Sequence, residues 1–196
     1  MYSTIFFDWS GVVADDSGDI FIRELFLGIG ANNDQVNDII KTYFKDFSKG
    51  ILSEIEFWDK IRVNYNLQIN EPISKEFKKW KGLVANQNII SLANEAKCSG
   101  LSTAVLTNII EPIYTIIKQA GYYDKFDETI ASCKVGFVKP QKEIYQLALN
   151  KLKTTAQQSI FIDDKLENIN VAAKMGFKVI LAENPNQIIH DVRNII

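Results

Sequence analysis

The sequence predicts an α/β protein whose core is a parallel sheet flanked by helices, with a helical segment inserted into it. Short runs of β-branched and aromatic residues recur along the chain, and stretches with a helical spacing of apolar residues lie between them. Strands that alternate with helices form parallel sheets with both faces covered. One stretch of about 70 residues breaks the alternation and is too long for a loop in a compact domain.

The first expected strand, residues 3–9, stops at Ser10-Gly11, a pair that favours a turn. Further strands are expected at residues 102–107, 128–131, 159–164 and 178–182. Helices are expected at residues 89–96, 112–120, 140–151 and 167–175, the third of them opening at Pro140.

The stretch between residues 15 and 85 has helical spacing of Phe, Leu, Ile and Trp and no clear strand pattern. We therefore expect two domains. Residues 1–14 and 86–196 form the α/β core, and residues 15–85 form a small helical module of their own.

Composition and charge exclude several classes of protein. The 196 residues are 46% hydrophobic and 23% charged, which suits an ordered globular chain with a substantial core. The 22 basic and 24 acidic residues give a net charge of -2, so we expect no nucleic-acid partner. Cys98 and Cys133 are far apart, and His190 is the single histidine, which excludes a disulfide framework, a zinc cluster and Ser-His-Asp catalysis.

The N-terminus carries no basic segment, and its apolar run is broken at Asp8. No stretch approaches 18 apolar residues. We expect a soluble, cytoplasmic protein with no membrane partner.

Polar side chains stand where the expected strands end. Asp8 ends the first strand, Thr107-Asn108 ends the second, and Asp163-Asp164 ends the fourth, while Lys139 precedes an expected helix. Ligands bind outside the carboxyl ends of parallel strands. Carboxylates, a hydroxyl and an ammonium at that edge fit a Mg²⁺ and phosphate site.

These residues resemble the motifs of the haloacid dehalogenase superfamily, whose phosphatases have an apolar strand ending in DxDG, then a Ser or Thr, a Lys and a terminal pair of acids. The counterparts here are Asp8-Trp9-Ser10-Gly11, Thr107, Lys139 and Asp163-Asp164. The sequence around them is similar to the branch with a helical cap after the first strand, and residues 49–58 look like the cap of small sugar-phosphate phosphatases. The resemblance implies a Rossmann-like core with residues 15–85 as the cap.

The resemblance also implies roles for the matched residues. Asp8 is expected to be the nucleophile that forms an aspartyl-phosphate. Thr107 and Asn108 are expected to bind the phosphoryl group, although Asn108 is also an ordinary turn residue. Lys139 is expected to offset charge between the nucleophile and the phosphoryl group.

The expected metal ligands are Asp8, the main-chain carbonyl of Ser10, Asp163 and Asp164. Asp163 is expected to complete the coordination shell of the Mg²⁺ ion. Asp164 is expected to bind the ion through water or to orient Lys139. Asn168 fits the family ending DDxxxN, where its amide ties the loop together, but a helix-surface position suits it equally. Neither Asp15 nor Asp16 is assigned a role.

One departure from the family matters. The phosphatases have a second Asp two residues after the nucleophile, which protonates the leaving group and then activates water, and here that position is Ser10. General acid–base catalysis contributes about 10²–10⁴-fold, so turnover is expected to be weakened while metal binding persists.

We expect a Mg²⁺-dependent phosphomonoester hydrolase that acts on a small phosphorylated metabolite. Two alternatives stay open: a 2-haloacid dehalogenase, because halide leaves without a proton, and a degenerate protein that binds a phosphorylated ligand without turnover. The adjacent acids Asp163-Asp164 weigh against the dehalogenase, because they would repel a carboxylate substrate in a metal-free site. The substrate and the oligomeric state cannot be read from the sequence.

Overall fold

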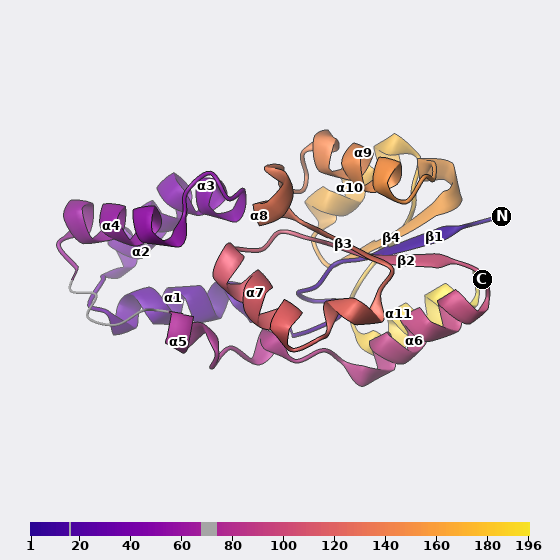
Figure 1. Cartoon of the computed structure of the whole chain (residues 1–196), viewed down its shortest axis with the longest axis horizontal. Helices are drawn as coiled ribbons and strands as arrows, with labels where there is room; N and C mark the ends of the chain where they lie inside the picture. Colours follow the sequence, from indigo (N-terminus) through magenta and orange to yellow (C-terminus); the bar gives the residue numbers. More distant parts are fainter. Residues whose placement is uncertain (16, 68–73) are drawn as a thin grey trace.

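A five-stranded parallel sheet forms the centre of the molecule (Figure 1). The computed structural model describes residues 1–15, 17–67 and 74–196. The sheet has the order β3-β2-β1-β4-β5, and its strands are β1 (Thr4–Phe7), β2 (Ser102–Thr107), β3 (Glu128–Ala131), β4 (Ser159–Asp163) and β5 (Lys178–Leu181). All five expected strands are confirmed: β2 and β3 have the expected bounds, and the ends of β1, β4 and β5 differ from them by one or two residues.

Helices cover both faces of the sheet, as predicted. They are α6 (Gln87–Cys98), α7 (Glu111–Gln119), α8 (Ser132–Val135), α9 (Lys142–Lys151), α10 (Leu166–Met175) and α11 (Pro185–Arg193), with short 3-10 turns at Tyr123–Lys125 and Ala156–Gln158. Alternate residues of β1 point to opposite faces. Ile5 and Phe7 pack in one core cluster with residues of α6, α7 and α11, whereas Phe6 packs in a second with residues of α9 and α10.

The central strand sets where functional side chains meet. Phe7 of β1 lies opposite Val105 of β2 and Ile162 of β4, so the carboxyl ends of three neighbouring strands lie at one edge. These ends face the inserted helices, which occupy the end of the molecule opposite the N-terminus (Figure 1).

The insert is helical in its described part. Its elements are α1 (Gly18–Gly28), α2 (Asn33–Ile39), a π-helical turn (Ile40–Phe44), α3 (Lys45–Ser48), α4 (Glu54–Tyr65), α5 (Ser74–Phe77) and a 3-10 turn (Lys81–Leu83). Aromatic rings form its centre: Phe47 stacks on Phe57 with ring centroids 4.2 Å apart, and Trp58 packs against Phe26 at 5.7 Å.

The chain leaves and re-enters the sheet domain at adjacent points. Ala14 forms an antiparallel bridge with Ala85, and the amide of Asn86 donates to the carbonyl of Val13 at 2.7 Å. This pairing supports the division into a core of residues 1–14 and 86–196 and an insert of residues 15–85, which stays a prediction.

Two expectations about helices were wrong or incomplete. Helix α9 begins at Lys142 and not at Pro140, because residues 138–141 form a tight turn in which the Gln141 amide donates to the Val138 carbonyl at 2.8 Å. Helices α8 and α11 were not predicted. Within the three described ranges, no helix has both the length and the apolar character needed to cross a membrane.

A destabilised insert tests the domain division. We expect Phe57→Ala, which removes a fully buried ring, to cost about 3–5 kcal/mol in the insert. Hydrogen exchange should then speed up in α2 and α4 and stay unchanged in β1 and β4. Equal acceleration in the strands would show that insert and sheet unfold as one unit.

Candidate active site

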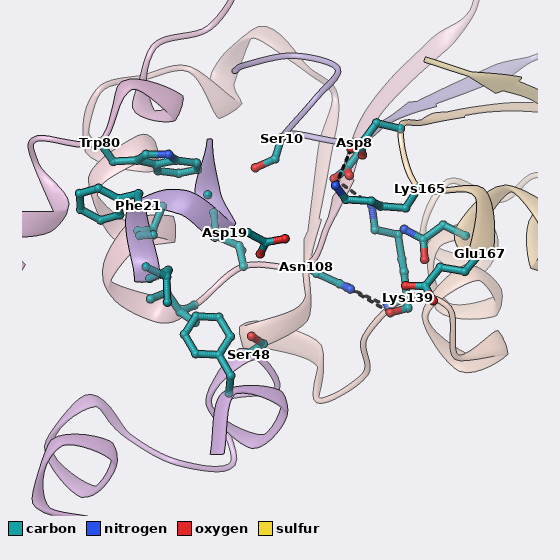
Figure 2. Close-up of a pocket in the computed structure, with 18 residues that line it drawn as sticks. Asp8, Ser10, Asp19, Phe21, Ser48, Trp80, Asn108, Lys139, Lys165 and Glu167 are labelled. Atoms are coloured by element: carbon teal, nitrogen blue, oxygen red, sulfur yellow. Dashed lines mark hydrogen bonds and ion pairs between the residues drawn. The ribbon is translucent and has the colours of Figure 1, made fainter. Parts of the chain in front are cut away.

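A pocket of about 450 Å³ opens between the sheet edge and the insert. Its floor carries Asp8, Ser10, Asn108, Lys139 and Asp164. Figure 2 shows the side chains of Ser10 and Asp8 at one end of the pocket, and the dashed contact between Asn108 and Lys139 on its floor. Most of the residues expected from strand ends are therefore brought together.

Asp8 is held by the loop that follows β1. Its amide donates to the carbonyl of Ile162 at 2.9 Å, which extends the β1–β4 pairing to this residue. The amide of Trp9 donates to Asp8 Oδ1 at 2.7 Å. The indole of Trp9 points away into the core, where Nε1 donates to the carbonyl of Gly82 at 2.8 Å.

Gly11 lets the loop after β1 lie against Asp164. Its φ is +78°, and a Cβ built there would lie 2.6 Å from Asp164 Cγ. Only glycine combines this left-handed backbone with such a close approach. The glycine therefore brings the Ser10 main chain and the Asp164 carboxylate together.

Lys139 is the buried cation of the site. Its side chain is 1% exposed, and Nζ lies 2.8 Å from Asp8 Oδ1 and 2.6 Å from Asp163 Oδ2. Asn108 holds the main chain of this lysine at both ends: the Lys139 amide donates to Asn108 Oδ1 at 2.7 Å, and Asn108 Nδ2 donates to the Lys139 carbonyl at 2.8 Å. Asn108 is therefore a positioning residue in addition to lining the pocket.

Asp163 is fully buried, and both of its carboxylate oxygens accept hydrogen bonds from several groups. Besides the bond from Lys139, Oδ1 accepts from the amide of Lys165 at 2.8 Å, and Asn168 Nδ2 donates to both oxygens at 2.9 and 3.1 Å. Asn168 is 4% exposed, so the surface position considered for it is wrong. Its amide holds a carboxylate, not neighbouring backbone.

The site carries more negative than positive charge. Ligand oxygens of Asp8, Asp163 and Asp164 lie within 4.8 Å of one another. Two ammonium groups face them: the buried Lys139, and the more exposed Lys165, whose Nζ lies 2.9 Å from Asp164 Oδ2. Burial raises the pKa of Asp8 to about 7, although the charge of Lys139 lowers it. Burial also disfavours charge on Lys139, but Asp8 and Asp163 outweigh it and hold the pKa of that lysine above its ordinary value. Such a donor set is suited to a hard divalent cation.

A family model described as haloacid dehalogenase-like hydrolase matches residues 2–176 of the chain. The chain belongs to this family of hydrolases. The motifs identified in the sequence thus place it correctly.

Relatives of this hydrolase include the sesquiterpene phosphatase astK of Aspergillus oryzae, 30% identical over 68% of this chain and 68% of the relative. The D-ribitol-5-phosphate phosphatase of Bacteroides thetaiotaomicron is 22% identical over 94% of this chain and 93% of the relative. The bifunctional epoxide hydrolase 2 of Mus musculus is 27% identical over 66% of this chain, which spans only 24% of that larger protein.

Solved structures of the family share the fold. A predicted HAD-like hydrolase from Porphyromonas gingivalis superposes with a TM-score of 0.82 at 19% identity, covering 100% of this chain and 98% of the other. A HAD family enzyme from Bacteroides thetaiotaomicron, solved with magnesium and inorganic phosphate, gives a TM-score of 0.75 at 18% identity, covering 94% and 96%.

Two sets of residues differ from the sequence-based picture. Thr107 ends β2 as expected and is 2% exposed, but the pocket lining at the end of this strand begins at Asn108, the residue after it. Asp19, Phe21 and Trp80 of the insert line the pocket and were not predicted. An acid in the first turn of a helix has the same sequence pattern whether it caps the helix or faces a ligand. Aromatic residues at helical spacing have the same pattern whether they pack in a core or line a pocket. The sequence therefore held no signal that these residues line the pocket.

A metal-free stability measurement tests the charge imbalance. Because the folded pKa of Asp8 lies above its ordinary 3.8, folding favours the protonated form, and this stabilisation is lost as the pH rises from about 4 to about 7. We expect Asp8→Asn to unfold a few degrees above the wild type at pH 8 in EDTA, with the difference vanishing near pH 4.

The control is Asp124→Asn, an exposed acid outside this pocket, which should show no such pH-dependent gap. A wild type more stable than Asp8→Asn at pH 8 without metal would contradict the assigned charge balance.

Proposed function

We propose that the chain is a Mg²⁺-dependent phosphomonoester hydrolase that works through an aspartyl-phosphate on Asp8 and acts on a small phosphorylated metabolite. The observation that carries the proposal is the buried Lys139 ammonium held between Asp8 and Asp163 on the floor of a pocket. A phosphoryl group placed there meets a nucleophile and a positive charge together. The two relatives named as phosphatases support the same class of reaction.

The nucleophilic step uses one oxygen of Asp8. The hydrogen bond from Trp9 and the ion pair with Lys139 both fall on Oδ1, which orients the carboxylate. Among the described residues no hydrogen bond is made to Oδ2, which is thus available to attack phosphorus as the bond to the alcohol oxygen breaks. Water then attacks the phosphorus of the aspartyl-phosphate, which releases phosphate and restores Asp8. Thr107 and Asn108, at the end of β2, would contact the phosphoryl oxygens.

We assign the metal to Asp8, Asp164 and the main-chain carbonyl of Ser10. Asp164 lines the pocket, whereas Asp163 is fully buried and accepts bonds from Lys139, Lys165 and Asn168. Asp163 is therefore proposed to hold Lys139, which reverses the order that the sequence favoured. Bound Mg²⁺ would neutralise charge on the phosphoryl oxygens.

Isothermal titration with Mg²⁺ alone tests this assignment. We expect Asp164→Asn to weaken Mg²⁺ binding at least tenfold with little change in Tm. Asp163→Asn should lower the Tm instead, because this fully buried carboxylate accepts bonds from the Lys165 amide and Asn168 as well as from Lys139, and an amide in its place cannot accept them all. The opposite result would be a large loss of Mg²⁺ affinity in Asp163→Asn with a normal Tm, and no loss of affinity in Asp164→Asn. That result would make Asp163 the metal ligand, as the sequence favoured.

The charge of the site favours phosphate esters with Mg²⁺ over 2-haloacids. Three carboxylates against the two ammonium groups of Lys139 and Lys165 leave a negative charge that repels a substrate carboxylate unless a cation is bound. Halide release from 2-haloacids without metal would overturn the proposal. Ligand-induced stabilisation with neither phosphate nor halide release would identify a binding protein.

Ser10 makes the rate depend on the leaving group. It supplies no carboxyl to protonate an alkoxide, so p-nitrophenyl phosphate should be cleaved measurably and alkyl phosphates poorly. The aspartyl-phosphate should accumulate, giving a burst of nitrophenol before a slow steady state. We expect Ser10→Asp to speed alkyl-phosphate hydrolysis within the roughly 10²–10⁴-fold range of a general acid–base group and to abolish the burst.

Asp19→Asn, made in the wild-type background, is the matched variant for this test, since the Asp19 carboxylate points into the same pocket as Ser10 (Figure 2). If Ser10→Asp changes neither rate nor burst while Asp19→Asn slows alkyl esters selectively, the insert already supplies the proton. That outcome would refute the hypothesis that the site lacks a general acid.

A further inference from the structure

The pocket has two unlike halves. The polar floor belongs to the sheet edge, while the opposite side is formed largely by an apolar wall from the insert and α7. We define the apolar wall as Phe21, Ile22, Phe44, Trp80, Ile110 and Ile113. Figure 2 shows Phe21 and Trp80 side by side on the wall, away from Asp8 and Lys139.

The wall is held in place by packing. The rings of Phe21 and Trp80 are stacked at 6.4 Å, and Trp80 Nε1 donates to Ser17 Oγ at 3.0 Å. Phe44 packs edge-on against Phe47 and Phe57 at 6.2 and 6.3 Å. These aromatic groups have their faces fixed before a ligand arrives, which favours binding of a complementary apolar group.

Polar partners for a substrate are few on this side. Of the insert residues that line the pocket within the described chain, Asp19 and Ser48 carry polar side chains. A polyol enclosed here would leave hydroxyls without hydrogen bonds, and each buried unpaired hydroxyl is unfavourable. Asp19 would also repel a second phosphate or a carboxylate on the substrate.

We propose that the apolar wall selects phosphomonoesters of apolar alcohols over those of polyols. This inference rests on the proposed phosphatase function and adds the chemical class of the leaving group. The ester oxygen lies at the floor beside Asp8, and the carbon chain lies against Phe21, Phe44 and Trp80.

Three aryl phosphates vary the polarity of the alcohol while the basicity of the leaving group stays nearly constant. They are phenyl phosphate, 4-butylphenyl phosphate and 4-(2,3,4-trihydroxybutyl)phenyl phosphate. Their phenolates are nearly equally basic, so rate differences report contacts of the tail. With Mg²⁺ we expect kcat/KM for the butyl ester to exceed that of phenyl phosphate by about tenfold to a hundredfold. The kcat/KM of the trihydroxybutyl ester should not exceed that of phenyl phosphate.

Wall variants localise the effect. Phe21→Ala and Phe44→Ala should each lower the preference for the butyl ester over phenyl phosphate by roughly three- to tenfold. The control is Ile20→Ala, which removes a neighbouring side chain that is 61% exposed and does not line the pocket. Its preference should stay at the wild-type value, and a loss there would overturn the assignment to the wall.

A binding readout keeps the two proposals apart. In Asp8→Asn with Mg²⁺, the butyl ester should raise the Tm more than the trihydroxybutyl ester at equal concentration. If the wild type releases no phosphate but this order holds, the hydrolase proposal fails and the ligand class survives. If phosphate is released and the hydroxylated ester, or choline phosphate, is preferred, the apolar-alcohol inference fails alone.

Discussion

The site depends on one buried ammonium placed between carboxylates of two neighbouring strands. Lys139 lies far from Asp8 and Asp163 in sequence, yet its Nζ contacts both within 2.8 Å. A lysine buried to this extent is stable only when its charge is compensated. The bonds from Asn108 to its main chain and from Asn168 to Asp163 serve this one contact. The ends of β1, β2 and β4 are thereby tied together.

The same arrangement leaves negative charge in excess, and this links stability to function. Lys139 pairs with Asp8 and Asp163, and the more exposed Lys165 pairs with Asp164, so two ammonium groups face three carboxylates. Burial raises the pKa of Asp8, and the neighbouring carboxylates add to this effect against Lys139. A structure selected for stability alone would replace one of these acids with an amide. Retaining them makes sense if a cation completes the site, because the cation brings the missing positive charge and also offsets the negative charge of a bound phosphoryl group.

The sequence predicted the sheet and the strand-end residues because both follow from local rules. Runs of β-branched residues specify strands, and parallel strands bring Asp8, Asn108 and Asp163 to one edge whatever the loops do. The roles proposed for Asp163 and Asp164 lay beyond such rules, since these adjacent acids at the end of β4 differ only in the direction that each side chain takes. The start of α9 was misplaced because Pro140 suits a first helical position and a turn equally well. Asp19 and Trp80 required knowledge of how the insert lies over the sheet.

The division of the pocket into a polar floor and an apolar wall suggests how the same reaction can be applied to different substrates in such a fold. The floor is fixed by charged hydrogen bonds between strands, so almost any change in it disturbs Lys139. The wall is held by ring packing within the insert. The insert joins the core where Ala14 pairs with Ala85 and the Asn86 amide donates to the Val13 carbonyl. Apolar packing is non-directional and tolerates changes of shape better than a buried charge network does. If the proposed function holds, substitutions at Phe21 or Phe44 can therefore alter the alcohol that is accepted while the proposed attack by Asp8 stays the same.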